Sequence, residues 1–260
     1  MNPNVEYVLH LADNALVLGQ RNAEWTGHGP ILEEDIAMSN ISLDLIGQAR
    51  LLYQLAARHL GGDATEDKLA YFRDVPEFRN YTLLELPHHA ALVGYAQEGL
   101  DFGTTIVRNF LYSALMVLYW QALTKSGDAE LAAIAEKSAK EARYHLHHSR
   151  DWLIKLGDGT EVSHQRTQAA LDHLYPYTRE FWSTSALEQA AVSSGIGVDM
   201  ATLQADWNQI VDSAIAEATL QKPEAQGYVT EGKKGLHSEH LGYLLAEMQS
   251  LARALPDATW

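Results

Sequence analysis

Apolar residues recur at the three-to-four-residue spacing of an α-helix along almost the whole chain, and alternating runs rich in Val, Ile and Thr are missing. The first pattern is typical of helices that bury one face, whereas exposed strands show a period of two. The sequence therefore predicts an all-α fold. A chain of 260 residues that is 47% hydrophobic can bury a large core. No shift in composition marks a boundary, so we expect one helical domain over residues 1–260.

Breaks in this periodicity predict where the helices end. Glycine follows several of the apolar patterns, as it does at the C-terminal ends of helices. The segment 104–124 is apolar on nearly every side, so we expect it to be the most buried helix. Pro87 falls in the first turns of a helix expected from Thr82, where proline is tolerated, and His88 and His89 would decorate that helix start. The expected helices cover about residues 3–22, 32–60, 66–73, 82 onward, 104–124, 129–156, 163 onward with a bend at Pro176, 199–220 and 237–255.

The charge balance and the absence of cysteine narrow the classes of function. A formal net charge of -15 disfavours nucleic acids and anionic membranes, because binding to either depends on clustered Lys and Arg. A chain without cysteine has no disulfide, Fe–S cluster or thiolate zinc site, so any metal would need His and carboxylate ligands. The N-terminus lacks the basic start of a secretory signal, and the longest uncharged run, 109–124, is shorter than a membrane span of about 20 residues. We expect a cytoplasmic protein.

The segment 136–153, EKSAKEARYHLHHSRDWL, crowds three histidines behind Glu141 on one expected helix. Four-helix carboxylate bundles hold two metal ions with such residues: two helices each give one Glu, and two others each give a Glu-x-x-His pair. The i and i+3 positions of such a pair face the same way. Here the position three after Glu141 is Tyr144, and the histidine follows one residue later, at His145. The pattern is displaced by one residue.

The other expected helices do not complete the ligand set. Asp44 lies in an apolar context, ISLDLIGQARLL, but Gly47 stands where the histidine is required, and the first helix offers only Asp13. The segment 102–123 contains no Asp or Glu. We therefore predict that this chain has no metal and no catalytic residue. The positions of the altered remnant site are Asp13, Asp44, Gly47, Glu141, Tyr144 and His145.

Several alternatives stay open for these residues. A shifted ligand set of Asp13, Asp44, Glu141 and His145 would make the chain a self-sufficient di-iron oxygenase. One weak metal ion could also lie between Asp44, Glu141 and His145. The simplest interpretation is a hydrogen bond or ion pair between Glu141 and His145, with Asp44 satisfied by a buried Tyr, Arg or His. Aromatic residues at helical spacing indicate core or interface, and those on the first three long helices are expected to anchor a partner.

Long segments spread over the chain carry a resemblance to a known family. On these segments the whole chain, residues 1–260, resembles the family of C subunits of phenylacetyl-CoA epoxidase, the non-catalytic partners in a bacterial multicomponent monooxygenase. The segments are NISLDLIGQARLLYQLAARHLGG, FRNYTLLELPHHA, EKSAKEARYHLHHSRDWLIKLGDGT and the block 232–260.

The resemblance implies a ferritin-like fold, with a four-helix-bundle core and additional helices. It also implies a related partner, the catalytic A subunit, which holds the di-iron centre, together with a reductase E subunit that carries FAD and an Fe–S cluster, and a small B subunit. That complex uses O2 and NADPH to epoxidise the ring of phenylacetyl-CoA in aerobic phenylacetate catabolism. This chain would then have a structural role without a cofactor and would be inactive alone. A helical binding module with no link to an oxygenase is the third hypothesis.

Overall fold

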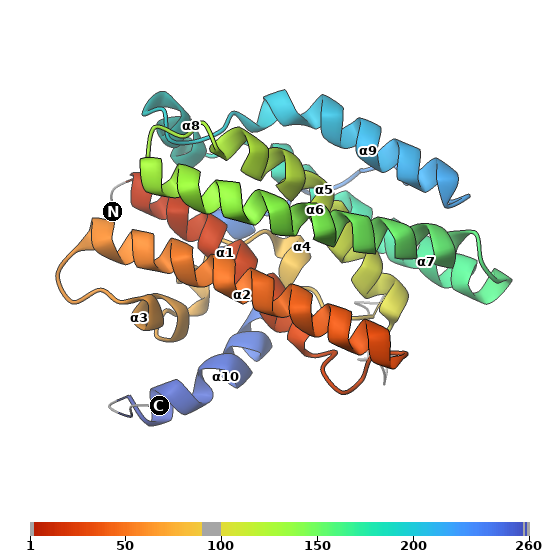
Figure 1. Cartoon of the computed structure of the whole chain (residues 1–260), viewed down its shortest axis with the longest axis horizontal. Helices are drawn as coiled ribbons and strands as arrows, with labels where there is room; N and C mark the ends of the chain where they lie inside the picture. The colour runs from red at the N-terminus through yellow and green to blue at the C-terminus, as the bar shows by residue number, and fades with distance from the viewer. Residues whose placement is uncertain (1–2, 90–99, 257, 259–260) are drawn as a thin grey trace. The chain divides into compact units, whose positions relative to one another are not determined.

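The computed structural model describes residues 3–89, 100–256 and 258, and in these ranges the chain forms α-helices and short 3-10 helices without a β-strand. An isolated β-bridge joins Glu231 and Leu236. The predicted all-α fold class is confirmed. The chain divides into two compact units: unit 1 comprises residues 1–87, 185–197 and 230–260, and unit 2 comprises residues 88–184 and 198–229. Each unit contains one pair of long helices, as each half of a ferritin-like bundle does (Figure 1).

The long pair of unit 1 is a helical hairpin of α1 (Pro3–Ala23) and α2 (Leu32–Leu60) (Figure 1). Both helices follow the apolar period read from the sequence, and the predicted bounds of α2 are confirmed. Gly19 lets the two backbones approach closely, because a Cβ there would lie 3.1 Å from Ile46 Cγ1. Gly61 ends α2 with a positive φ of 69°, a conformation that glycine adopts without strain.

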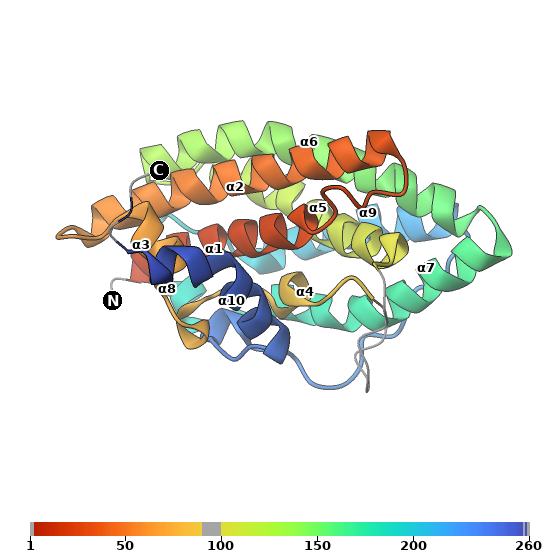
Figure 2. The ribbon, with the colours of Figure 1, turned by 90° about the horizontal axis from the view of Figure 1, so that it is seen from below.

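Shorter helices pack beside this hairpin in unit 1. Figure 2 shows α10 next to α3. Thr65 and Ser185 cap α3 and α8 by accepting backbone N–H groups three residues on. The short elements of unit 1 are α3 (Glu66–Tyr71), the 3-10 helix η1 (Val75–Glu77), α4 (Thr82–Glu85), α8 (Ala186–Ser193), the 3-10 helix η4 (Gly232–Lys234) and α10 (Glu239–Ala254).

The helix predicted from Thr82 through Pro87 is wrong in its length. α4 ends at Glu85, and residues 86–89 are not helical. Leu86 takes an extended conformation, with ψ 147°, because a residue before proline is disfavoured in the helical region. The rest of that expected helix, residues 90–99, lies outside the described residues.

The long pair of unit 2 is a hairpin of α5 (Phe102–Leu123) and α6 (Ala129–Gly157) (Figure 1). Of the 22 residues of α5, 17 are buried, so the prediction of a helix buried on nearly every side is confirmed. Asp128 caps α6 by accepting the N–H groups of Glu130 and Leu131, each at 3.0 Å.

In the rest of unit 2, aromatic side chains pack on Trp207. Its indole N–H donates to the Leu111 carbonyl at 3.2 Å, and the rings of Tyr175 and Phe181 pack on it. Pro176 lies at the start of η2, where the chain leaves α7, so the predicted bend is confirmed. The elements are α7 (Glu161–Leu174), the 3-10 helices η2 (Tyr175–Trp182) and η3 (Met200–Leu203), and α9 (Gln204–Glu217). Within the described ranges, no helix combines the length and the apolarity that crossing a membrane requires.

Candidate functional site

Asp13, the remnant position on α1, is fully buried and surrounded by donors from its own unit. Its Oδ1 accepts hydrogen bonds from the Tyr53 hydroxyl at 2.6 Å and from the Arg73 guanidinium. Its Oδ2 accepts from Arg73 Nη1 at 3.1 Å and from the backbone N–H of Arg79 at 2.8 Å. Tyr53 comes from α2, while Arg73 and Arg79 flank η1. Each carboxylate oxygen therefore already accepts two hydrogen bonds.

Arg73 is the cation that neutralises Asp13, and it is itself buried. Its Nε donates to the Leu69 carbonyl at 2.6 Å and Nη1 also to the Glu77 carbonyl at 3.0 Å, while the guanidinium lies 4.3 Å from the Phe78 ring centroid. Burial acts to lower the pKa of Arg73, but the charge and hydrogen bond of Asp13, together with Tyr53 and Glu77, outweigh it and raise the pKa above its ordinary value. Because a guanidinium stays charged, Asp13 is neutralised without a metal ion.

The two remnant positions on α2 give no second ligand pair. Asp44 and Gly47 are both half-buried. A Cβ added to Gly47 would meet no atom within 4 Å, so the place of the required histidine is open space. Asp44 is less buried than its apolar sequence context suggested. Its predicted Tyr, Arg or His partner stays a prediction.

On α6, the three remnant positions differ in burial. His145 is buried, Glu141 is half-buried, and Tyr144 is 48% exposed. Glu141 forms an ion pair with Lys137 one turn earlier, at 3.3 Å. Tyr144 therefore turns away from the buried face on which a ligand would have to lie. The predicted pair of Glu141 with His145 stays a prediction.

The two further histidines of the segment lie outside this face. His147 is exposed, and its Nε2 is 3.5 Å from Asp151. His148 is half-buried, with its ring 6.3 Å from that of Tyr144. The predicted direction of His147, away from Glu141 and His145, is confirmed.

The helix without carboxylates, α5, carries a buried cation instead. Arg108 is fully buried, and its Nη2 lies 2.8 Å from Nδ1 of His88, which is also 2.6 Å from the Thr105 hydroxyl. Arginine can only donate, so Nδ1 of His88 accepts and has no lone pair left for a metal. His88 is buried and lies in a non-helical stretch, so it does not decorate an exposed helix start.

A second buried ion pair in unit 1 was not predicted. Lys233 Nζ lies 3.0 and 2.9 Å from the two carboxylate oxygens of Glu188, with side chains 5% and 1% exposed. Ser185 adds two donors, its backbone N–H and its hydroxyl, both at 2.8 Å. Burial acts to raise the pKa of Glu188, but Lys233, and after it His10, lower the pKa below its ordinary value. The S-x-x-E spacing of 185–188 could have indicated the cap, but no sequence signal marks Lys233.

These side chains do not fit a di-iron centre held by this chain. Both oxygens of Asp13 are occupied by protein donors, Gly47 has no donor, and α5 presents Arg108. Over residues 3–89, 100–256 and 258, no three or more His, Asp and Glu side chains are grouped so that they could share a metal ion. The shifted ligand set needs Asp13, which Arg73 already binds.

The aromatic side chains of the first three long helices expected from the sequence, over 3–22, 32–60 and 104–124, are core residues. The expectation that they anchor a partner is wrong, because each is at most 3% exposed and has no accessible ring. The apolar side chains that α2 does expose include Leu32, Ile36 and Leu43. The buried aromatics concerned are Tyr7, Tyr53, Phe110, Tyr112, Tyr119 and Trp120.

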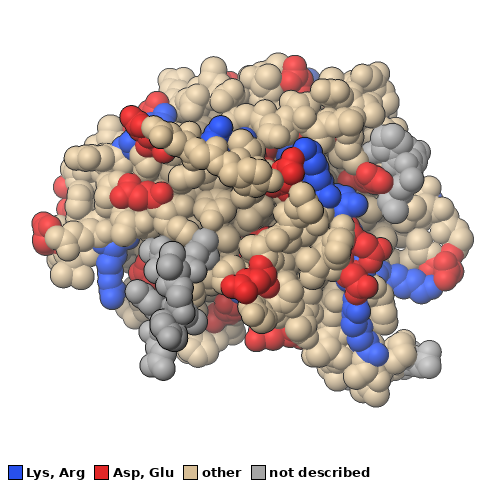
Figure 3. Space-filling view, turned by 180° about the vertical axis from the view of Figure 1, so that it is seen from behind, with Lys and Arg blue, Asp and Glu red and all other residues tan. Residues whose placement is uncertain are grey.

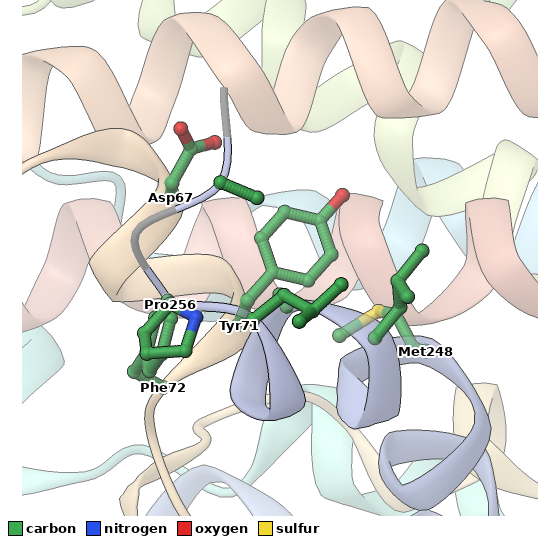
Figure 4. A pocket seen from close by; sticks show the side chains of 9 residues that line it. Asp67, Tyr71, Phe72, Met248 and Pro256 are labelled. Atoms are coloured by element: carbon green, nitrogen blue, oxygen red, sulfur yellow. The ribbon is translucent and has the colours of Figure 1, made fainter. Parts of the chain in front are cut away.

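A groove of about 400 Å³ lies in unit 1 between α3 and α10 (Figure 4). Its walls are mainly apolar, and Asp67 is its one acidic residue; the labelled residues are Asp67, Tyr71, Phe72, Met248 and Pro256. No nucleophile with an adjacent base is found among the lining residues, so the groove lacks the constellation of a catalytic centre.

Charged side chains are mixed on the surface drawn in Figure 3. Lys and Arg lie among Asp and Glu there, and the described residues of this face form no broad basic patch. The prediction, from the net charge of -15, that nucleic acid is not a partner stays a prediction.

Comparisons with known proteins match the whole chain. A family model described as "Phenylacetic acid catabolic protein" matches residues 1–260. The C subunit of the "1,2-phenylacetyl-CoA epoxidase" of Escherichia coli (strain K12) is 46% identical over 260 residues, which cover 100% of both chains. The resemblance read from the sequence is confirmed.

Proposed function

The chain belongs to the phenylacetic acid catabolic protein family, and we propose that it is the C subunit of a cytoplasmic 1,2-phenylacetyl-CoA epoxidase. In this role it is a structural subunit of an enzyme of aerobic phenylacetate catabolism, and it does not itself react with oxygen. Identity of 46% with one such C subunit, along the full length of both chains, carries the proposal.

The proposed partner is a related helical chain, the catalytic A subunit, which holds the di-iron centre. The complex also contains a reductase E subunit with FAD and an Fe–S cluster, and a small B subunit. Oxygen activation needs a cluster of carboxylates and imidazoles on a metal. In this chain the Asp13 carboxylate is instead bound by Arg73 and Tyr53, which supports a division of labour between two related chains.

The test is co-expression of this chain with its catalytic relative in iron-rich medium, followed by size measurement and iron counting. We expect a stable complex that contains about two iron atoms per pair of chains, as a di-iron bundle requires. The chain expressed alone should bind no stoichiometric iron and turn over no substrate with the reductase. Stoichiometric iron with an oxo-bridged absorption band in the isolated chain would overturn the proposal.

A second experiment distinguishes a subunit of such a complex from a helical binding module with no link to an oxygenase. Obligate interfaces are broad and apolar, so we would replace the exposed Leu43 of α2 with lysine and compare it with Tyr228→Lys, an equally exposed apolar residue in unit 2. Loss of pairing in only one of these variants maps the interface to that surface. Failure of the unchanged chain to co-purify with the catalytic relative would favour the binding module.

A further inference from the structure

His237, just before α10, places both of its ring nitrogens against oxygen acceptors. Nδ1 lies 2.8 Å from Oε2 of Glu85, and Nε2 lies 3.0 Å from the backbone carbonyl of Phe78. A neutral imidazole has one N–H donor and one acceptor nitrogen, whereas an imidazolium has two donors. Neither the carbonyl nor an ionised carboxylate can donate. Only the protonated ring satisfies both contacts.

Hydrogen-bond donors surround the carboxylate of Glu85. The side chains of Glu85 and His237 are both 0% exposed. Besides the imidazole, the carboxylate accepts from the backbone N–H of Ser238 at 2.6 Å and from Asn80 Nδ2 at 2.9 Å. Several hydrogen bonds donated to a buried carboxylate stabilise its charged state. A buried negative charge held in this way calls for a positive partner, and His237 is in contact with it.

The pair lies where it can hold α10 in place. Ser238 is the residue before α10, so the Glu85 carboxylate sits at the N-terminus of that helix, where the helix dipole favours negative charge. Phe78 and Glu85 belong to the segment 78–85 that precedes and includes α4. The imidazole thus joins the start of α10 to this segment at two points.

The other charged groups near His237 either bind other residues or also raise the pKa of His237. Arg21 of α1 donates to the backbone carbonyls of Glu85 and His240. Lys233 of η4 is paired with Glu188 of α8, and Asp13 of α1 raises the pKa of His237 through space. Burial acts to lower the pKa of His237, but the hydrogen bond and charge of Glu85, together with the Phe78 carbonyl and Asp13, outweigh it, so the pKa lies above its ordinary value.

We propose that the imidazolium of His237 and the carboxylate of Glu85 form a proton-dependent clamp that fixes the start of α10 to the segment 78–85 and loosens at alkaline pH. Loss of the proton removes one of the two donors and leaves Glu85 buried beside a neutral ring. Because the folded-state pKa is raised, the stabilisation is complete below the ordinary pKa of histidine. It is lost as the pH rises through the raised value.

Two measurements on the full chain test the clamp. The first is ¹⁵N NMR of the imidazole of His237, which should show both nitrogens protonated at about pH 7. The second is amide hydrogen exchange of α10, corrected for the intrinsic rate. Protection at the start of α10 should fall about tenfold per pH unit between the ordinary pKa of histidine and the raised pKa of His237, as expected for one linked proton, and should level off above the raised value.

The matched variants are His237→Gln, which cannot become charged, and His28→Gln, which alters an exposed loop histidine. His28→Gln should keep the pH dependence, and His237→Gln should abolish it. The NMR result decides the question in the unchanged chain even if His237→Gln does not fold. A ring with a single proton at about pH 7, or α10 protection that does not change with pH, would overturn the clamp.

Discussion

Two buried acidic side chains of unit 1 and Glu141 of α6 in unit 2 are held in opposite ways. Asp13 and Glu188 are buried, and each meets a buried cation, Arg73 or Lys233. Glu141 on α6 keeps 18% of its side chain exposed, and its partner Lys137 is mostly in solvent. Exposed ion pairs contribute about 0–1 kcal/mol. Removing one partner from a buried pair costs about 3–5 kcal/mol.

This contrast shows that a segment can look like a functional site in the sequence and still contribute little to the stability of the fold. The segment 141–148 has the composition of a metal site, but among its Glu, Tyr and His residues only His145 is buried. Asp13, which lies within the apolar pattern of α1, accepts hydrogen bonds from Tyr53, Arg73 and the Arg79 N–H. The stability of unit 1 should therefore depend on single buried charges, and α6 should tolerate substitution of Glu141 and His147.

The largest effect is expected from Arg73→Met. This change removes the guanidinium but keeps an apolar side chain, so Asp13 remains buried with only Tyr53 and the Arg79 N–H as donors. We expect a loss of about 3–5 kcal/mol in the free energy of unfolding, measured by urea titration.

The control for Arg73 is Arg50→Met, which breaks an exposed pair with Glu66 and should cost about 0–1 kcal/mol. If both variants lose the same small free energy of unfolding, the buried ion pair of Asp13 is no more important for stability than an exposed pair. The contrast between buried and exposed ion pairs is then wrong.

A smaller loss is expected from Lys233→Met. Glu188 would lose its cation but keep both donors of Ser185, so the buried carboxylate stays partly satisfied. We expect a cost of about 2–3 kcal/mol, in the range of hydrogen bonds to charged groups. The neighbouring Lys234→Met, at an exposed pair with Glu231, serves as the control in the same urea titration. Equal losses in the two variants would contradict the prediction.

Acid pH provides a milder test of the same pair. The pKa of Glu188 is lowered, chiefly by Lys233 acting against burial, so its contribution to stability is present above the ordinary pKa and is lost as pH falls through the folded-state value. Unfolding midpoints measured below about pH 4.3 should therefore decline less steeply in Glu188→Gln than in the unchanged chain. An unchanged slope in Glu188→Gln would mean that the pair does not titrate in this range.

The positions of the helices could be predicted from the sequence because they depend on the local spacing of apolar residues and on the glycine and proline residues that end helices. The bounds of α2 and the bend at Pro176 were predicted correctly for this reason. The end of α4 was missed, although Pro87 restricts Leu86 in a way that depends only on neighbours in sequence.

The partners of the buried charges could not be predicted. Arg73 lies 60 residues from Asp13, and Lys233 lies 45 residues from Glu188. Such pairs depend on where the loops place residues relative to the helices. No rule of local sequence spacing predicts that placement. The remnant ligand pattern could be recognised because Glu-x-x-His is a local spacing, and its displacement at Tyr144 and Gly47 could be seen without coordinates.

The smallest effect is expected from Glu141→Ala. The ion pair with Lys137 spans one turn at the surface of α6, so its loss should change the free energy of unfolding by about 0–1 kcal/mol. A ligand would behave otherwise, because removing it would lower the iron content of the complex. Iron per pair of chains, measured after co-expression with the catalytic relative, should equal that of the unchanged complex. Iron loss in Glu141→Ala would restore α6 as a ligand helix, and a large loss of stability would make Glu141 a buried charge like Asp13.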